Sequence, residues 1–171
     1  ITGLSLIDTR NVLTLRNTLS NLPSLRFIAG FEDWDVRKCE SFYMFIAQPD
    51  DNAFEGVLDF SGWNVSRAVL VALEDANKPD ADKVQPFMGM VNKCRGAAAI
   101  SFNKTFDFSV DLQYLPLNLE GEVWMDTATG QTYYDIDGNK MVDDRDDLPN
   151  PYFEGRNITF EAVRKESEVT I

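Results

Sequence analysis

The stretch from Phe106 to Tyr114 constrains the fold more than any other part of the sequence. Apolar residues alternate there with polar residues over nine positions. Successive side chains of a β-strand point to opposite faces, so this pattern predicts a strand with one buried and one solvated face. Burial on one side only is typical of antiparallel sheets. The chain is therefore expected to be mainly β.

Short runs of β-branched and aromatic residues, bounded by turn residues, predict the other strands. These runs are 26–31, 41–47, 54–60, 97–103, 122–127, 131–136 and 157–162. Gly130 supplies the positive φ that a hairpin turn between 122–127 and 131–136 needs. The stretch 66–76 suits a buried helix as well as a strand, because periodicity cannot separate the two in a short apolar run.

One helix is expected near the N-terminus. Apolar residues from Thr9 to Leu22 fall at helical spacing, and Pro23 ends the run. The same leucine spacing resembles a leucine-rich repeat, but no second copy follows, and a single repeat cannot bury its own face. No shift in composition marks a linker. We therefore predict one domain over residues 1–171, an antiparallel β-sandwich-like α+β fold with an N-terminal helix.

The chain has no histidine, which excludes a Ser-His-Asp triad, a histidine general base and a two-histidine zinc site. Its 28 acidic and 16 basic side chains give a net charge of −12. Such a surface argues against binding to nucleic acid or anionic lipid, because both need clustered Lys and Arg. The longest apolar runs are about six residues, far below the roughly 20 that span a bilayer. We expect no nucleic acid partner and no membrane insertion.

Several features favour an extracellular or otherwise extracytoplasmic protein. The start at Ile1 is not one of them, because it is expected both for a processed chain and for a domain cut from a longer precursor. Cys39 and Cys94 could form one disulfide, and the alternative is two buried reduced thiols. Three triplets match the acceptor pattern for N-linked glycans, beginning at Asn64, Asn103 and Asn157.

Residues 135–146 read D-I-D-G-N-K-M-V-D-D-R-D, a spacing suited to an oxygen cage for calcium. Ligands of a twelve-residue calcium loop come from positions 1, 3, 5, 9 and 12, with a main-chain carbonyl at position 7. The segment resembles the EF-hand-like loops of dockerins over these residues only. The ligands at those positions are Asp135, Asp137, Asn139, Asp143, Asp146 and the carbonyl of Met141.

Two departures from the loop pattern predict weak calcium binding. Lys140 stands where such loops usually have glycine, and Asp146 is shorter than the usual bidentate glutamate. The dissociation constant is therefore expected in the range of about 10⁻⁴ to 10⁻³ M. Six carboxylates between Asp135 and Asp147 would repel one another without a cation, which favours a bound ion. The alternative is an acidic turn that is simply solvated.

Two other groups of residues could serve a ligand or a reaction. Glu32, Asp33 and Asp35 surround Trp34, as a pair of carboxylates beside an aromatic platform would in a glycoside hydrolase; the alternative is an exposed acidic bend. Aromatic residues near the calcium-like loop could stack on a sugar or a protein partner, or could pack in the core as cross-strand pairs. The ligand-binding candidates among them are Trp124, Tyr133 and Tyr134.

The leading hypothesis is a non-catalytic extracytoplasmic module, stabilised by calcium and used for adhesion, assembly or as a subunit of a larger complex. Its partners would be other protein subunits or a glycan. The first alternative is a carbohydrate-binding module or an acid-dependent glycoside hydrolase. The second alternative is a viral or organellar structural subunit without a ligand of its own.

Overall fold

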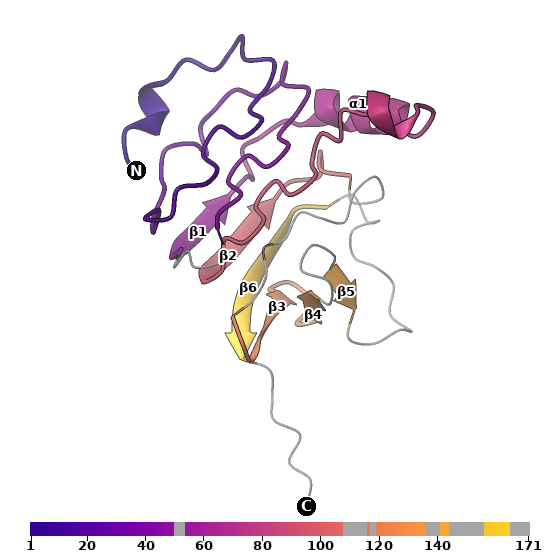
Figure 1. Ribbon diagram of the computed structural model, residues 1–171. Helices are drawn as coiled ribbons and strands as arrows, with labels where there is room; N and C mark the ends of the chain where they lie inside the picture. Colours follow the sequence, from indigo (N-terminus) through magenta and orange to yellow (C-terminus); the bar gives the residue numbers. More distant parts are fainter. Residues whose placement is uncertain (50–53, 108–115, 117–118, 136–140, 144–155, 165–171) are drawn as a thin grey trace, which may run out of the picture.

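The computed structural model describes residues 1–49, 54–107, 116, 119–135, 141–143 and 156–164, and the side chains of all of these except 133–135 and 141–143. These residues form an α+β domain with a six-stranded sheet in the order β1-β2-β6-β3-β4-β5 (Figure 1). The strands are β1 (Gly56–Asp59), β2 (Ala97–Phe102), β3 (Glu122–Asp126), β4 (Thr132–Asp135), β5 (Met141–Asp143) and β6 (Ile158–Arg164). The described helices are α1 (Ser66–Asp75) and the short 3₁₀ turns Leu4–Leu6 and Asp80–Asp82.

The sheet is mixed, so the prediction of an antiparallel sandwich is not confirmed. Strands β1 and β2 are parallel, whereas β2 with β6, β6 with β3, β3 with β4 and β4 with β5 are antiparallel. The β3–β4 hairpin was predicted correctly, and Gly130 in its turn has φ +73. Phe106, at the start of the alternating stretch, is buried, and positions 108–114 of that stretch lie outside the described residues.

Much of the N-terminal half runs in coils that lie side by side rather than in strands or helices (Figure 1). We call residues 12–36 coil 1, residues 39–65 coil 2 and residues 84–107 coil 3. The coils run in the same direction, which is why β1 of coil 2 and β2 of coil 3 pair in parallel. Helix α1 is inserted between coil 2 and coil 3. The ambiguous stretch 66–76 is therefore a helix over most of its length.

Main-chain hydrogen bonds join the three coils along one side. We call this side the turn ladder, and it consists of residues 14–21, 41–48 and 86–93. The N–H groups of Leu15, Asn17, Leu19 and Asn21 donate to carbonyls of coil 2 over 2.8–3.0 Å. The N–H groups of Phe42, Met44, Ile46 and Gln48 donate in turn to carbonyls of coil 3 over 2.7–2.9 Å. The donors follow every second residue, as in a β-ladder.

Left-handed residues distinguish the turn ladder from ordinary strands. Asn17, Met44 and Gly89 occupy equivalent positions in the three coils, with φ +53, +48 and +61. Asn21 and Lys93, four residues after Asn17 and Gly89, also have positive φ. Main-chain bonds such as Phe45 N to Phe42 O close a turn around each of the three equivalent positions. The ladder is therefore a series of turns joined sideways to its neighbours.

The predicted helix from Thr9 to Leu22 is wrong for this reason. Its main-chain N–H groups donate to carbonyls of coil 2, as Leu19 N does to Phe45 O, and not to the carbonyl four residues earlier as in a helix. Two left-handed residues four apart put Leu15 and Leu19 on the inside, which imitates helical spacing. The run 41–47 is likewise turn ladder, and 26–31 contains no strand pairing.

The coils repeat one another, although the sequence was expected to contain no repeat. Leu4, Phe31, Phe60 and Phe102 follow one another on the inside of the stack, all buried. The Trp34 indole N–H donates to the carbonyl of Leu4 (2.8 Å), and the Trp63 indole N–H donates to that of Phe31 (2.8 Å). The repeated pattern is Phe-x-x-Trp-Asp/Asn-Val at 31–36 and 60–65. It was missed because aromatic residues stand where a leucine-rich repeat would have leucine, and because α1 separates these two copies from coil 3.

Stacked aromatic rings fill the space between the coils. Trp63 is fully buried and lies within 4.9–6.5 Å, between ring centroids, of five other rings. Phe42 of coil 2 stacks on Phe87 of coil 3 at 5.8 Å. These buried rings contribute apolar area to the core and pack one coil against the next.

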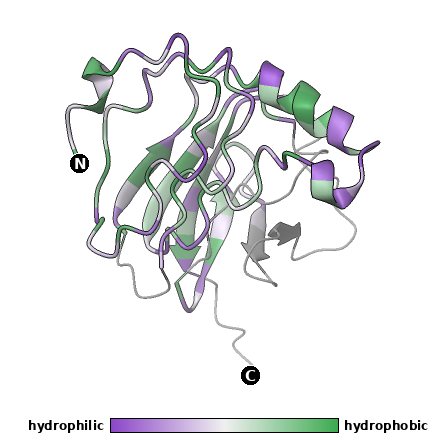
Figure 2. Cartoon of the chain, turned by 45° about the horizontal axis from the view of Figure 1, so that its top comes forward, coloured by the Kyte–Doolittle hydropathy of each residue, from purple (hydrophilic) through white to green (hydrophobic). Residues whose placement is uncertain are grey.

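Helix α1 packs on this stack through Ala68 and Val71. Leu70 and Leu73 of the same helix are half exposed, and the helix carries both hydrophobic and hydrophilic segments along its length (Figure 2). At its C-terminal end Asp75 is buried and accepts a hydrogen bond from Gln85 N (2.8 Å), which fixes the start of coil 3. None of the helices described here is long and apolar enough to cross a bilayer.

Candidate functional site

A polar groove of about 640 Å³ lies along the edge of the stack. It is formed by two chain segments, the one that leads from residues 1–9 into coil 1 and the one that leads from coil 1 into coil 2. Three cationic side chains, one amide and one carboxylate line it, namely Arg10, Arg37, Lys38, Asn11 and Asp35. Lys38 Nζ donates to Asn11 Oδ1 over 2.7 Å, which joins the turn before coil 1 to the turn before coil 2. The groove thus collects positive charge on a chain whose net charge is −12.

The stacking of coils brings these residues together, because the same short motif occurs twice. In Asp8-Thr9-Arg10 and again in Asp35-Val36-Arg37, the aspartate accepts the N–H of the arginine two residues on, closing a turn. Each guanidinium then donates to both carboxylate oxygens of its aspartate. Arg10, Arg37 and Lys38 were not among the residues predicted to form a site. The signal that could have found them is the Asp-x-Arg motif repeated 27 residues apart.

The same pairing decides what the aspartates can do chemically. Side-chain hydrogen bonds from Arg10 and Arg37 lower the pKa of Asp8 and of Asp35 to about 2. Both carboxylates are therefore ionised at any ordinary pH. A general acid needs a proton near its working pH, so neither aspartate suits that role.

The carboxylates considered as candidate catalytic groups surround a tryptophan that belongs to the core. Trp34 is buried and stacks on Trp63, with ring centroids 6.5 Å apart, so it offers no exposed platform. Glu32 Oε2 accepts the N–H of Gly30 (2.7 Å), and Asp33 is exposed. The three acidic residues of this cluster thus have separate surroundings, which agrees with the alternative of an acidic bend.

Of the aromatic candidates, Trp124 belongs to the core. Its side chain is 1% exposed, and its indole N–H donates to the carbonyl of Pro116 (2.9 Å). A ring that is covered in this way cannot stack on a ligand, so the core alternative holds for Trp124. Tyr133 and Tyr134 lie in β4, where Tyr133 pairs with Trp124 on one side and with Asp143 on the other.

The calcium-like loop lies at the β4–β5 end of the sheet. The backbone of Asp135 pairs with that of Met141, and Asp143 lies two residues further along β5. The other predicted ligands, Asp137, Asn139 and Asp146, lie outside the described residues. The calcium site therefore stays a prediction.

The two cysteines are free thiols in the core, which is the second of the two alternatives. Cys39 Sγ donates to Ser41 O (3.3 Å) and Cys94 Sγ donates to Ile46 O (2.9 Å). Burial raises the pKa of both thiols, so neither is a ready nucleophile.

The three possible glycan acceptors differ in their surroundings. Asn64 and Asn157 are exposed, and their side-chain oxygens accept Ser66 N and Lys104 N. Asn103 is only half exposed, and its Nδ2 donates to the carbonyls of Ser61 (2.8 Å) and Trp63 (2.5 Å). A glycan on Asn103 would remove one of these two donors. Asn64 and Asn157 are therefore the better acceptors in the folded chain.

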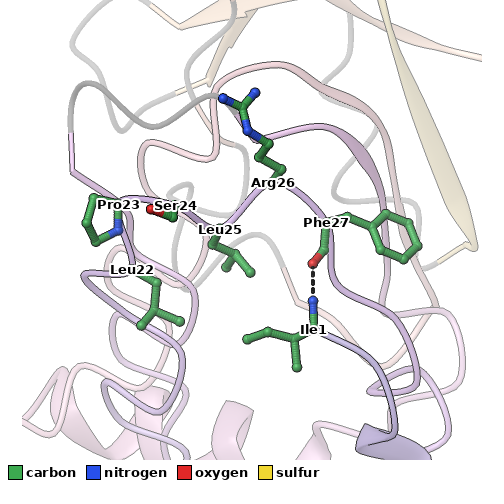
Figure 3. A pocket seen from close by; sticks show the side chains of 7 residues that line it. All are labelled: Ile1, Leu22, Pro23, Ser24, Leu25, Arg26 and Phe27. Carbon is green, nitrogen blue, oxygen red and sulfur yellow. Dashed lines mark hydrogen bonds between the residues drawn. The ribbon is translucent and has the colours of Figure 1, made fainter.

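An apolar groove of about 500 Å³ lies where Ile1 meets residues 22–27, on the side of coil 1 that faces away from coil 2. Figure 3 shows Leu22, Leu25 and Ile1 around it, with the ring of Phe27 turned away from them and the amino group of Ile1 donating to Phe27 O over 2.7 Å. Phe27 is 50% exposed and Ile1 is 45% exposed. This end of the stack therefore presents apolar side chains to solvent.

Comparison with known proteins adds no relative. No family model matches the chain, and neither a curated protein nor a solved structure matches it. Its function has to be inferred from its own residues.

Proposed function

We propose that this chain is a non-catalytic structural or interaction module that binds another protein through the polar groove. The observation that supports this most directly is the repetition of cationic side chains in the turns that lead into coil 1 and coil 2, with Arg10 and Arg37 each held by the aspartate two residues before it. Side chains fixed in this way can bind an anionic group with little further loss of conformational freedom. Arg37 and Lys38 supply hydrogen-bond donors for carboxylates of a partner.

Titration with a hexaglutamate peptide at low salt tests this proposal. We expect amide shifts in the NMR spectrum to gather at Arg10, Arg37 and Lys38, and binding to weaken as salt is added, because the contacts are electrostatic. Replacing Arg37 and Lys38 by alanine should weaken binding at least tenfold. The control is Arg164→Ala, at the exposed end of β6. Shifts that spread evenly over the surface, or none, would contradict the proposal.

A second candidate function is carbohydrate binding at the same groove. Arginine, asparagine and aspartate are planar groups with several hydrogen-bonding atoms, which suits recognition of sugar hydroxyls. A glycan array tests this alternative. Binding to a defined sugar that is lost in Asn11→Ala, with no response to hexaglutamate, would favour the carbohydrate candidate over the protein partner.

We also propose that the loop of residues 135–146 binds calcium and stabilises the β4–β5 hairpin. This proposal is supported by the spacing of its carboxylates and by the pairing of Asp135 with Met141 at the base of the loop. An extracytoplasmic location, where free calcium is abundant, follows as part of the same proposal. Asn64 and Asn157 are then its candidate glycan acceptors.

Thermal unfolding with calcium and with EDTA tests the metal site. For a dissociation constant of about 10⁻⁴ to 10⁻³ M, 10 mM calcium adds about 1.4–2.7 kcal/mol of stability. For a chain of this length that raises Tm by about 3–10 °C. Asp137→Asn should abolish the rise, whereas Asp82→Asn, a change to an exposed acid elsewhere, should not. A Tm equal in calcium and EDTA would overturn the metal site.

A further inference from the structure

The end of the coil stack at coil 1 carries a row of main-chain acceptors. Leu15, Asn17, Leu19 and Asn21 direct their N–H groups at coil 2. A trans peptide unit is planar, and its C=O points opposite to the N–H of the next residue. The carbonyls of the four preceding residues therefore point away from coil 2. These residues are Thr14, Arg16, Thr18 and Ser20, and among the described residues none donates to their carbonyls.

Coil 2 shows how such a row is used. The carbonyls of Ser41, Tyr43, Phe45 and Ala47 occupy the corresponding positions, and each accepts an N–H from coil 1 over 2.8–3.0 Å. The next peptide units of coil 2 repeat the arrangement toward coil 3. The stack thus has a polarity, with acceptors facing one end and donors facing the other. At coil 1 the acceptor side is left open.

An acceptor-only edge restricts what can bind to it. The edge of an ordinary strand offers donors and acceptors in turn, so that it can pair with a second strand of the same kind. Two acceptor-only edges cannot pair, which excludes two copies of this chain meeting head to head through the turn ladder. The net charge of −12 opposes association of copies in any orientation.

The apolar groove continues the open edge. Its lining residues Leu22, Leu25 and Phe27 follow Ser20 directly along coil 1, and Ile1 closes the far side (Figure 3). Between coils 1 and 2 the turn ladder is likewise followed by an apolar contact, in which the ring of Phe27 covers Gly56. The row of carbonyls and the apolar groove together therefore resemble one side of the interface that joins two stacked coils.

We propose that this end of the stack docks a coil of a partner protein, running parallel to residues 14–21. The partner coil presents N–H groups of alternate residues to the four carbonyls, and it places an apolar side chain in the groove beside Leu22 and Ile1. The proposal deepens the proposed interaction function, but it uses a different surface. A failure of hexaglutamate to bind the polar groove would leave it intact.

A tethered coil tests the docking. A second copy of residues 4–30 is inserted after Gly3. One additional coil with the sequence of coil 1 then precedes the original residues 4–171. We expect the amides of the added Leu15, Asn17, Leu19 and Asn21 to be protected from hydrogen exchange at least 100-fold, and Tm to rise by several degrees. The matched control replaces the added Asn17 and Asn21 by proline, which has no N–H and cannot adopt positive φ. Protection should be lost there.

The other outcomes decide against the proposal. If the original domain keeps its NMR spectrum while the added amides exchange as in an unfolded chain, the edge does not accept a coil. Sedimentation of the unaltered chain tests the remaining possible occupant, which is a second copy of this chain. Self-association that the tethered coil abolishes would assign the edge to a second copy of this chain and overturn the choice of a partner protein.

Discussion

At the scale of single residues, two aspartate–arginine pairs show how burial changes the value of one chemical contact. Asp8 and Arg10 have side chains 58% and 73% exposed, so water and salt screen their attraction. Asp126 is fully buried and contacts Arg156, whose side chain is 24% exposed. Burial opposes ionisation of Asp126, but bonds from Arg156 and from Ala128 N outweigh it, and the pKa of this carboxyl is lowered.

The Asp126 pair predicts a pH dependence of stability. A carboxyl whose pKa is lower in the folded chain stabilises it above the unfolded pKa, near 4, and this contribution is lost as pH falls through the folded value. Asp126→Asn should therefore cost about 2 kcal/mol at pH 7, and less at pH 2. Urea unfolding at the two pH values measures this difference.

Asp8→Asn is the control, because it removes an exposed pair of the same type. It should lower the free energy of unfolding much less than Asp126→Asn does, because solvent screens the exposed pair. Equal losses from the two substitutions would show that Asp126 is not buried as described.

At the scale of elements, the sequence predicted the parts whose pattern is local. Strands β1, β2, β3, β4 and β6 all fall within predicted runs or within two residues of them. Gly130 marked the hairpin because its φ is required by the turn itself. In these segments the side-chain period and the turn residues carry the information within about ten residues of chain.

The turn ladder could not be predicted in that way. Its hydrogen bonds join residues 26 or 44 positions apart, as from Leu15 to Ser41 and from Phe42 to Pro86. Its apolar residues recur every four positions and so imitate a helix. Asn17 and Asn21 were the residues that could have indicated these turns, because asparagine tolerates the left-handed region better than most residues. The polar groove escaped prediction for the same reason, since Arg10 and Lys38 meet only when the coils stack.

Glycine substitutions separate a turn ladder from a helix. Asn17 has φ +53, so Asn17→Gly should leave stability unchanged or raise it by up to about 1 kcal/mol. Thr18 lacks positive φ, and Thr18→Gly should cost about 0.5–1 kcal/mol. Denaturant midpoints of the two variants give the comparison. A similar loss from both would match a helix over residues 9–22 instead.

At the scale of the whole molecule, the chain is a stack of coils joined to a small mixed sheet. Buried rings from successive coils, such as Phe31, Phe60 and Phe102, form one continuous core. Strand β2 belongs to coil 3 and also pairs with β6, so the sheet and the stack share this strand. The surfaces proposed to act are the edge and the open end of the stack, where residues from separate coils meet.

The most direct test of this account is NMR detection of scalar couplings across hydrogen bonds in the turn ladder. The stacked coils predict couplings from the amide nitrogens of Leu15, Asn17 and Leu19 to the carbonyl carbons of Ser41, Tyr43 and Phe45. Couplings from Leu19 to Leu15 and from Leu15 to Asn11 would instead show a helix. That result would contradict the stack and, with it, both proposed binding surfaces.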